Sequence, residues 1–371
     1  MVQKIVWNWQ QKDWAHFTYD LADIADLEEE FLKKAGESFG IAKHFSSSEK
    51  RDITIQMISN EALKTSEIEG EILDRESLQS SIKRYFGLKA PLTYNHPAEN
   101  GIAEMMIDLY HHYDAPLTHE TLWAWHTMLM NNRRDLHDIG CYRTYIEPMQ
   151  VISGYVHAPT IHFEAPPSQE IKREMDDFIN WFNRTGPSGE APLPALIQSS
   201  IAHLYFESIH PFEDGNGRIG RALVEKALAQ HLKHPTLIAL SQVINDKRKD
   251  YYNALESQNK HNHIDGWLKY FAEIILKAQQ YTIDQMDFII KKAKFFDKFK
   301  DQMNSRQHKV IARMMREGIK GFEGGLSAKN YMAITQTSAS TTTRDLQDLV
   351  EKKILIQTGT LKGVRYWLHM L

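Results

Sequence analysis

The sequence has 371 residues, of which 42% are hydrophobic and 25% charged, an ordinary globular balance with enough chain for two or three domains. Its formal net charge of −4 gives no global indication of nucleic-acid or membrane-surface binding. The single cysteine, Cys141, excludes an internal disulfide and is poor evidence for a metal site, which favours a reducing compartment. The start has no apolar core of a signal peptide, and no apolar run reaches the roughly 18 residues that span a bilayer. We therefore expect a cytoplasmic protein with no membrane partner.

Residues 1–95 are predicted to form an N-terminal helical domain. Three tryptophans open it, and a helical pattern of apolar residues follows as far as Leu32. Residues 52–73 place their apolar side chains near one face of a second helix, and a shorter helix is predicted at about 75–85. The stretch 87–101 is rich in turn residues and predicts a loop.

Residues 96–290 are predicted to form the core of the protein. Two helices are expected at about 100–132. The β-branched stretch at about 150–163 is broken by Ser153 and Gly154, which predicts a short hairpin. Further helices are expected at about 168–184, 195–209, 218–232, 246–258 and 263–292.

Residues 291–371 differ in charge and in pattern from the rest. They hold 16 Lys and Arg against 7 Asp and Glu, a balance of +9, which leaves −13 for residues 1–290. Three short helices followed by two short strands are predicted, the order of a winged helix. The third helix begins with Ser and Thr and carries Arg344, and the strands bring Lys362 and Arg365 into a wing. Such residues contact DNA phosphates or bases. Winged helices also serve as protein-interaction or dimer modules, so DNA, a protein partner and a homodimer stay open.

The loop from His210 to Gly217 combines three kinds of chemistry. Its glycines leave backbone N–H groups uncovered where a helix begins, and such a terminus attracts phosphate. Arg218 and Arg221 lie on one face of that helix, and guanidinium groups grip phosphate oxygens in fork geometry. Asp214 supplies a hard oxygen of the kind that Mg²⁺ takes together with substrate phosphates. His210 titrates near neutral pH. A base, a metal ligand and a phosphate cradle together indicate group transfer from a nucleotide.

Each part of this pattern also has an ordinary structural explanation. A Gly-Asn-Gly turn is often only a helix start, a lone histidine is usually structural, and two arginines on a helix are usually solvated. The segment also resembles a calcium-binding loop faintly, but Arg218 stands where that loop needs Asp or Asn. No Walker-type phosphate loop occurs. The combination within twelve residues is what carries the functional prediction.

The run HPFEDGNGRIGR resembles the signature of Fic-domain proteins, H-P-F-x-[DE]-G-N-G-R-x-x-R, at every fixed position. The likeness extends over about 100–275. It implies a mainly α fold, with a Fic helical core, a short β-hairpin flap and a C-terminal winged-helix-like domain. It also implies a protein adenylyltransferase, which uses ATP and Mg²⁺ and moves AMP to a Ser, Thr or Tyr hydroxyl of a target protein or of itself.

The resemblance gives each matching residue a role. His210 would deprotonate the attacking hydroxyl, and Asp214 would hold Mg²⁺. The backbone of Gly215, Asn216 and Gly217 would cradle phosphate oxygens. Of the two arginines, Arg218 would contact the β-phosphate side and Arg221 the γ-phosphate. Phe212 is expected to anchor the loop in the core.

Residues 65–70, TSEIEG, resemble the inhibitory motif of the family, [ST]-x-x-x-E-[GN]. Glu69 would pair with Arg221, which would displace the γ-phosphate and misalign the α-phosphate. A solvated helix residue is the alternative. If the helix is regular, Glu67 and Glu71 point elsewhere. Alignment of a water for AMP removal is a lesser possibility.

Two further elements of the family have counterparts in the sequence. The hairpin at about 150–163 resembles the flap, whose edge would bind an extended target segment through its main chain. A structural hairpin is the alternative. In relatives a tyrosine pair and a downstream asparagine lie beside adenine, which makes Tyr252 and Asn259 the candidate adenine contacts. Aromatic residues at this spacing are more often core residues.

Two other functions compete with adenylyl transfer. One is transfer of another group on the same fold, such as a phosphate or a different nucleotide. The other is a DNA-binding regulator whose Fic core only senses a nucleotide. The sequence leaves open the target protein, the modified side chain and the signal that releases Glu69.

Overall fold

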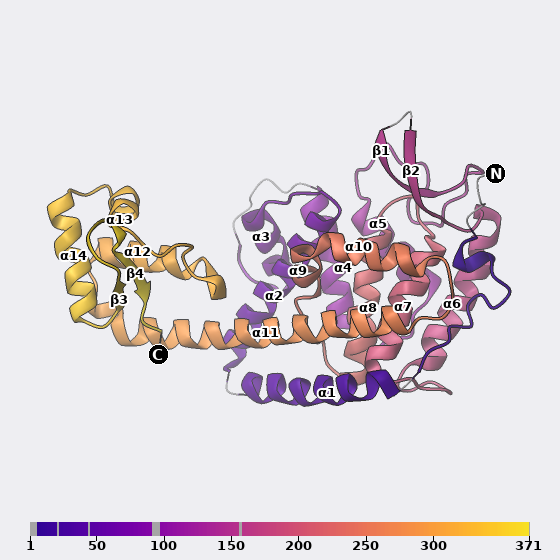
Figure 1. Cartoon of the computed structure of the whole chain (residues 1–371), viewed down its shortest axis with the longest axis horizontal. Coiled ribbons are helices and arrows are strands. Elements are labelled where there is room, and N and C mark those ends of the chain that lie inside the picture. The colour runs from indigo at the N-terminus through magenta and orange to yellow at the C-terminus, as the bar shows by residue number, and fades with distance from the viewer. Residues whose placement is uncertain (1–5, 21, 44, 91–96, 156–157, 371) are drawn as a thin grey trace. The chain divides into compact units, whose positions relative to one another are not determined.

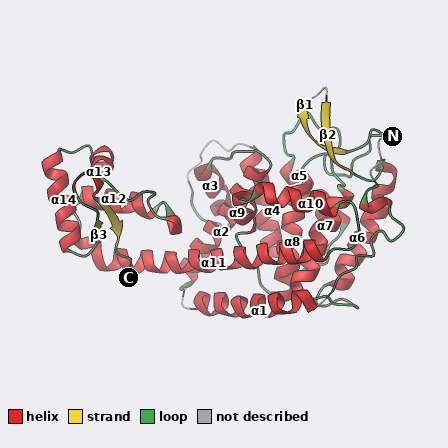
Figure 2. Cartoon of the chain, viewed as in Figure 1, coloured by secondary structure: helices red, strands yellow, loops and turns green. Residues whose placement is uncertain are grey.

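A computed structural model of the chain describes residues 6–20, 22–43, 45–90, 97–155 and 158–370. The fold is mainly α, as predicted, with two small antiparallel strand pairs among the described residues (Figure 2). The chain divides into two compact units, residues 1–282 and 283–371. The helices of the first unit (Figure 1) are α1 (Ala22–Lys43), α2 (Ser47–Ile68), α3 (Arg75–Tyr85), α4 (Pro97–His112), α5 (His119–Leu129), α6 (Ile171–Thr185), α7 (Ala195–Ile209), α8 (Asn216–Leu232), α9 (Leu240–Asp246) and α10 (Arg248–Gln258).

The antiparallel pair of α7 and α8 forms the centre of the first unit. Helix α7 is buried nearly all round, because one face packs into each of two hydrophobic clusters. Tyr205 and Phe206 belong to one cluster, whereas Leu196 and Leu204 belong to the other. Helix α8 is divided in the same way between the two clusters. The loop that joins these helices is thus fixed at both ends by buried structure.

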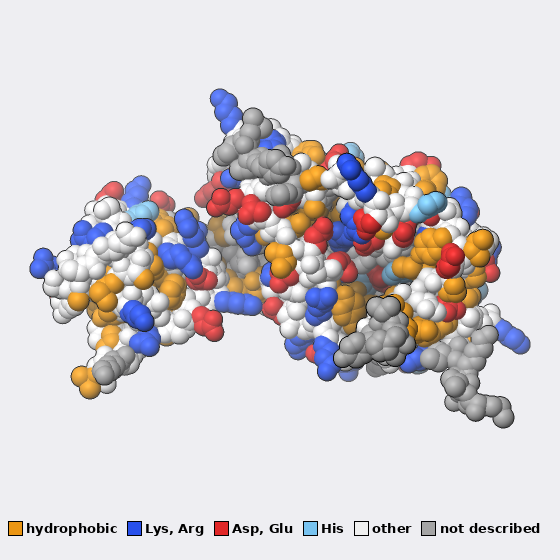
Figure 3. All heavy atoms as spheres, turned by 90° about the horizontal axis from the view of Figure 1, so that it is seen from above, with side chains coloured by type: hydrophobic (Ala, Val, Ile, Leu, Met, Phe, Trp, Pro, Cys, Tyr) orange, Lys and Arg blue, Asp and Glu red, His pale blue; other side chains and the backbone are white. Residues whose placement is uncertain are grey.

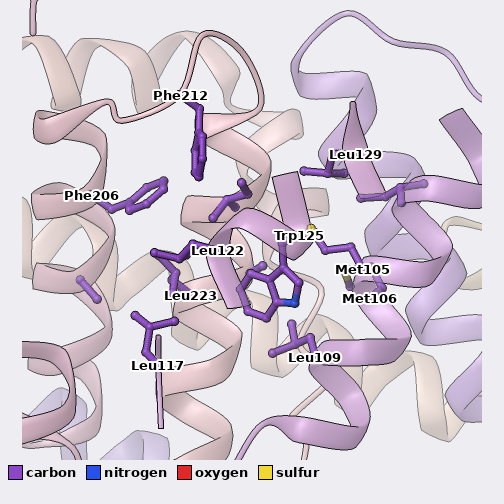
Figure 4. Packing of buried hydrophobic residues seen from close by; sticks show 14 of the residues in the cluster. Met105, Met106, Leu109, Leu117, Leu122, Trp125, Leu129, Phe206, Phe212 and Leu223 are labelled. Atoms are coloured by element: carbon purple, nitrogen blue, oxygen red, sulfur yellow. The ribbon is translucent and has the colours of Figure 1, made fainter. Parts of the chain in front are cut away.

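The cluster shown in Figure 4 lies directly below this loop. Phe212 points from the loop into the cluster, where it is fully buried beside Phe206. Its ring also stacks on His126 of α5, with centroids 4.2 Å apart. The expectation that Phe212 anchors the loop is confirmed. Full burial of a phenylalanine stabilises the folded state by roughly 1.5–3 kcal/mol, which ties the loop to the core.

Helix α2 ends at Ile68, five residues before the predicted end at residue 73. Gly70 has a φ of +85°, a left-handed conformation that stops a helix. The N–H of Gly70 donates to the carbonyl of Glu67, and that of Glu71 donates to the carbonyl of Ser66. These two bonds make a Schellman turn, which redirects the chain after Glu69. The prediction of a longer helix was wrong because it gave Gly70 no terminating role.

The predicted hairpin is present as β1 (Gln150–Tyr155) and β2 (Ala158–Glu164), paired antiparallel with an irregularity between Val151 and Ile152. The described part of the N-terminal segment supports its base. The indole of Trp9 donates to the carbonyl of Glu164, and Trp7 packs edge-on against Phe163. The tryptophan-rich start therefore braces the hairpin against the core.

Helix α11 (Asp265–Phe299) begins in the first unit and ends in the second. The second unit then holds α12 (Ser305–Met315), α13 (Ala328–Thr335), α14 (Ala339–Glu351), β3 (Leu355–Thr358) and β4 (Arg365–Leu368). They enclose a hydrophobic cluster of their own. The predicted order of three helices and two paired strands is present. Assignment of this order to a winged-helix module stays a prediction.

The sequence divides the chain at residues 95 and 290, whereas the structure has one division, after residue 282. Ile55 and Ile58 of α2 share a cluster with α4, α5 and the α7–α8 pair. The segment expected as a separate N-terminal domain is therefore packed into the same compact unit as the core. This packing brings the end of α2 to the loop that follows α7.

Candidate functional site

A cleft of about 640 Å³ opens in the first unit between the loop after α7, the hairpin and α10. It brings together most of the residues that the sequence singles out, although they come from segments far apart in the chain. These cleft residues are Glu69, His210, Asp214, Gly215, Asn216, Gly217, Arg221, Tyr252 and Asn259. Arg218 is not part of the lining and lies nearby, on the first turn of α8.

The backbone of the loop is set by two left-handed residues and one side chain. His210 ends α7 with a φ of +50°, and Gly215 begins α8 with a φ of +85°. Between them, the Asn216 side chain accepts a hydrogen bond from the Phe212 N–H and donates one to the Phe212 carbonyl. These bonds close the loop on itself and leave the first backbone N–H groups of α8 at the cleft.

Arg143, which the sequence did not single out, holds the other side of the loop. Its backbone N–H donates to the carbonyl of Pro211, and its guanidinium donates to the carbonyls of His210 and Pro166. The side chain is buried, and burial lowers the pKa of Arg143 to about 10. Loop and hairpin base are thus linked through one buried cation.

The imidazole of His210 is held neutral in the cleft. Burial lowers the pKa of His210 to about 4, and the nearby Arg143 acts in the same direction. Glu207, one turn earlier on α7, has a carboxylate oxygen 3.9 Å from Nδ1 of His210. Burial also raises the pKa of Glu207 to about 8, and the charge of Glu69 adds to this effect. A neutral imidazole is the form that accepts a proton from a hydroxyl.

Glu69 lies over the beginning of α8 and pairs with Arg221. Its Oε1 accepts from Nη2 of Arg221 at 2.7 Å. Arg221 also donates to the hydroxyl and to the carbonyl of Thr65. A Cβ on Gly217 would overlap Oε1 of Glu69, so only glycine lets a charged oxygen approach this turn. The place occupied by the Glu69 carboxylate is therefore an anion site.

Arg218 is paired by Glu71, the carboxylate two residues after Glu69. Its Nη1 donates to Oε2 of Glu71 at 2.8 Å, and its Nη2 lies 3.3 Å from Oδ1 of Asp214. Glu71 does not pair with Arg221, as expected, but the reason differs from the expected regular helix, because the turn at Gly70 ends the helix and brings Glu71 to Arg218. Glu67 does point away, toward Lys64 and Asn245.

Asp214 is a half-buried carboxylate that faces two cations. Oδ2 accepts from Arg133 at 2.8 Å, and Arg133 is itself held by Asp135. Burial opposes ionisation of Asp214, but Arg218 and Arg133 outweigh it and hold its pKa below the usual value. Among the residues that the structure describes, no three His, Cys, Asp or Glu side chains are grouped to hold a metal. One ionised carboxylate beside an anion site still fits Mg²⁺, which takes its other ligands from phosphates and water.

The far wall of the cleft carries the two candidate adenine contacts. Tyr252 of α10 is partly exposed beneath the guanidinium of Arg248, and Asn259 follows the end of the helix. On the same helix, Glu256 pairs with His162 of the hairpin at 2.7 Å. This pair, absent from the sequence prediction, links the hairpin to α10 across the cleft.

Most of the residues that the prediction missed act on the site from distant parts of the chain. Arg133, Arg143 and Glu71 contact site residues that are distant in sequence, whereas Glu207 lies one turn before His210. Only the Gly70 turn signal pointed to Glu71. No local pattern marks Arg133 or Arg143.

Comparison with known families agrees with this geometry. The sequence profile described as "Fic/DOC family" matches residues 116–228, which include α7 and most of α8 with the loop between them. The chain contains a Fic/DOC family domain. A second profile, described as "Domain of unknown function (DUF4172)", matches residues 7–88. Glu69 lies within the DUF4172 match, so its contact with Arg221 joins the two matched regions.

The chain also resembles curated proteins over about a third of its length. The chain is 29% identical over 119 residues to a protein adenylyltransferase Fic of Nematostella vectensis, covering 32% of this chain and 25% of the relative. It is 32% identical over 118 residues to a probable protein adenylyltransferase of Aquifex aeolicus, covering 31% and 33%. The chain thus spans a quarter to a third of the length of these relatives.

Solved structures share the fold over a greater length than the Fic/DOC match. A Fic family protein from Desulfovibrio desulfuricans G20 superposes with a TM-score of 0.55 at 20% identity, covering 94% of this chain and 96% of that one. A Fic domain containing signaling protein from Bacteroides thetaiotaomicron gives 0.51 at 15% identity, covering 71% and 98%. Within the described ranges, no helix has the length and apolarity to cross a membrane.

Proposed function

We propose that this chain is a protein adenylyltransferase that moves AMP from ATP to a Ser, Thr or Tyr hydroxyl, and that Glu69 inhibits it. The observation that carries the proposal is the anion site above Gly217, where a carboxylate sits on Arg221 at the beginning of α8. The terminal phosphate of ATP has the charge and oxygen geometry to replace that carboxylate. The relatives' names support adenylyl transfer for the Fic/DOC domain.

The residues of the cleft divide the reaction between them. His210, neutral and largely buried, takes the proton of the target hydroxyl, whose oxygen attacks the α-phosphorus. The oxygen–phosphorus bond forms as the bond to the β-phosphate bridge breaks, and pyrophosphate leaves. The backbone at Gly215, Asn216 and Gly217 holds the phosphate oxygens. Asp214 would hold Mg²⁺, which neutralises phosphate charge when it is bound. The hairpin would offer a strand edge to the target segment.

The inhibited state follows from the pairing of Glu69. While the Glu69 carboxylate is paired with Arg221, this arginine cannot bind the γ-phosphate. ATP then binds with its α-phosphate displaced from His210. A misplacement of about 1 Å costs on the order of a hundredfold in rate. Release of Arg221 requires that the Glu69 side chain, which is 29% exposed, leaves the arginine.

The test is incubation of the purified Glu69→Gly variant with Mg²⁺ and ATP labelled at either the α- or the γ-phosphate. We expect label on the chain itself from the α position alone, with an AMP adduct in mass spectrometry. Replacement of His210 by alanine in the same variant should abolish the label. Label retained from the γ position would show phosphate transfer instead, and no label from either position would favour a nucleotide sensor.

For the second unit we propose DNA binding, on the evidence of one surface. The exposed positions of α14 include Ser340, Thr343, Arg344 and Gln347, which offer hydroxyl, amide and guanidinium groups. Lys and Arg side chains are also spread over the face of this unit that Figure 3 shows. Such groups contact phosphates and base edges. If the second unit does not bind DNA, a protein partner is the alternative.

A further inference from the structure

The segment that carries Glu69 engages both arginines of the signature, and each arginine is paired by a different carboxylate. Glu69 pairs with Arg221 at 2.7 Å, and Glu71 pairs with Arg218 at 2.8 Å. The turn at Gly70 makes this possible, because it places two carboxylates separated by one residue over two arginines that are three apart on α8.

The surroundings of Arg218 make its pairing with Glu71 important. The guanidinium is 5% exposed, so it needs an anionic partner, whereas the Glu71 side chain is 36% exposed and can leave. The remaining carboxylate near Arg218 is Asp214 at 3.3 Å, which also accepts from Arg133. Glu71 therefore supplies the closer ion pair of Arg218.

The base of the turn is fixed, so that the two side chains are the parts free to exchange. Thr65 is buried and receives two hydrogen bonds from Arg221. Ile68 is fully buried in the core. Backbone bonds to Ser66 and Glu67 close the turn. An incoming nucleotide thus meets a rigid support from which only the carboxylates of Glu69 and Glu71 must move.

We infer that Glu71 is a second inhibitory residue, which blocks the phosphate subsite of Arg218 while Glu69 blocks that of Arg221. This inference rests on the proposed function, in which Arg218 meets the β-phosphate side and Arg221 the γ-phosphate. Full release of the two arginines then requires both carboxylates to leave. A diphosphate competes with Glu71 alone, whereas a triphosphate competes with both residues.

Calorimetric binding of Mg-ADP and Mg-ATP separates the two contacts without measuring catalysis. The variants are Glu71→Gln, Glu69→Gly and the double variant, compared with the wild type. We expect Glu71→Gln to lower the dissociation constants of ADP and ATP alike, by roughly fivefold. This is the effect expected when one partly exposed ion pair no longer competes with the nucleotide. Glu69→Gly should tighten the binding of ATP more than the binding of ADP. For ATP, the fold-change in affinity of the double variant should approach the product of the fold-changes of the two single variants.

Glu67→Gln is the matched control, because Glu67 lies in the same turn but pairs with Lys64 and Asn245. It should bind both nucleotides as the wild type does. Thermal unfolding confirms that each variant is folded, and Glu71→Ala provides a second substitution that retains no hydrogen bond to Arg218.

The possible failures are distinguishable. If Glu69→Gly tightens ATP but both Glu71 variants bind ADP no better than Glu67→Gln, Glu71 has only a structural role and the inference is overturned. If no variant binds either nucleotide, the proposed function itself fails together with the inference.

Discussion

His210 shows how burial prepares a single residue for its chemistry. A histidine in water is half protonated at a pH of about 6.5, so it would be an incomplete base in mildly acidic solution. In the cleft, burial and the charge of Arg143 lower its pKa to about 4. The neutral form is therefore the one present over the whole neutral range, and the residue needs no further activation to accept a proton.

Titration of the wild-type protein by NMR tests this shift directly. The His210 ring resonance, assigned by comparison with His210→Ala, should stay constant from about pH 8 to about pH 5.5, the range in which an unperturbed histidine titrates. Because the folded pKa lies below the unfolded one, the unfolded chain binds more protons in this window. The contribution of His210 to stability is thus complete above about pH 6.5 and is lost progressively as the pH falls toward 4. A ring that titrates with an ordinary midpoint would contradict the burial argument.

At the scale of elements, the site depends on close contacts between helices that carry no catalytic residue. Gly101 of α4 lies against the backbone of α5, and a Cβ there would overlap the carbonyl oxygen of Met128. Helix α5 bears His126, on which Phe212 stacks. The approach of α4 to α5 therefore supports the anchor of the signature loop.

Two glycine substitutions distinguish the effect of this close packing on stability from the effect of helix propensity. Gly101→Ala should lower the free energy of unfolding by about 3 kcal/mol, because the clash is with backbone that cannot move aside locally. Gly36→Ala on α1 has open space around its Cβ and should raise stability by roughly 0.5–1 kcal/mol. Urea unfolding of both variants measures the difference. Equal effects at the two positions would show that α4 and α5 do not pack this closely.

At the scale of the whole molecule, the described part of the chain forms two units with separate hydrophobic cores. The first encloses the cleft and the Fic/DOC domain, and the second has an independent hydrophobic cluster. The second unit, residues 283–371, holds 16 Lys and Arg against 9 Asp and Glu, a balance of +7 in a chain whose net charge is −4. This charge favours a polyanionic partner for the second unit.

A gel-shift experiment with the full chain and a mixed-sequence DNA duplex tests this partner. We expect binding at low salt that weakens steeply as salt rises, with Arg344→Ala reducing the slope of log K against log salt by about 1. Lys34→Ala, on α1 of the first unit, is the control and should leave the slope unchanged. Absence of any shift at low salt would point to a protein partner instead.

The sequence by itself determined the parts of the protein whose information is local. Periodicity located α3 and α7 at their observed bounds, and the motif around His210 identified the loop and its residues, because a tight turn with bare backbone needs those residues in that order. The motif around Glu69 likewise identified the residue that meets Arg221. Tertiary structure decided which charged groups face one another. The pairing of Glu71 with Arg218, the hold of Arg143 on His210 and the raised pKa of Glu207 arise from segments that pack together only in the fold. Ion pairing and desolvation depend on distance in space and on burial, and neither quantity is encoded in the spacing of residues along the chain.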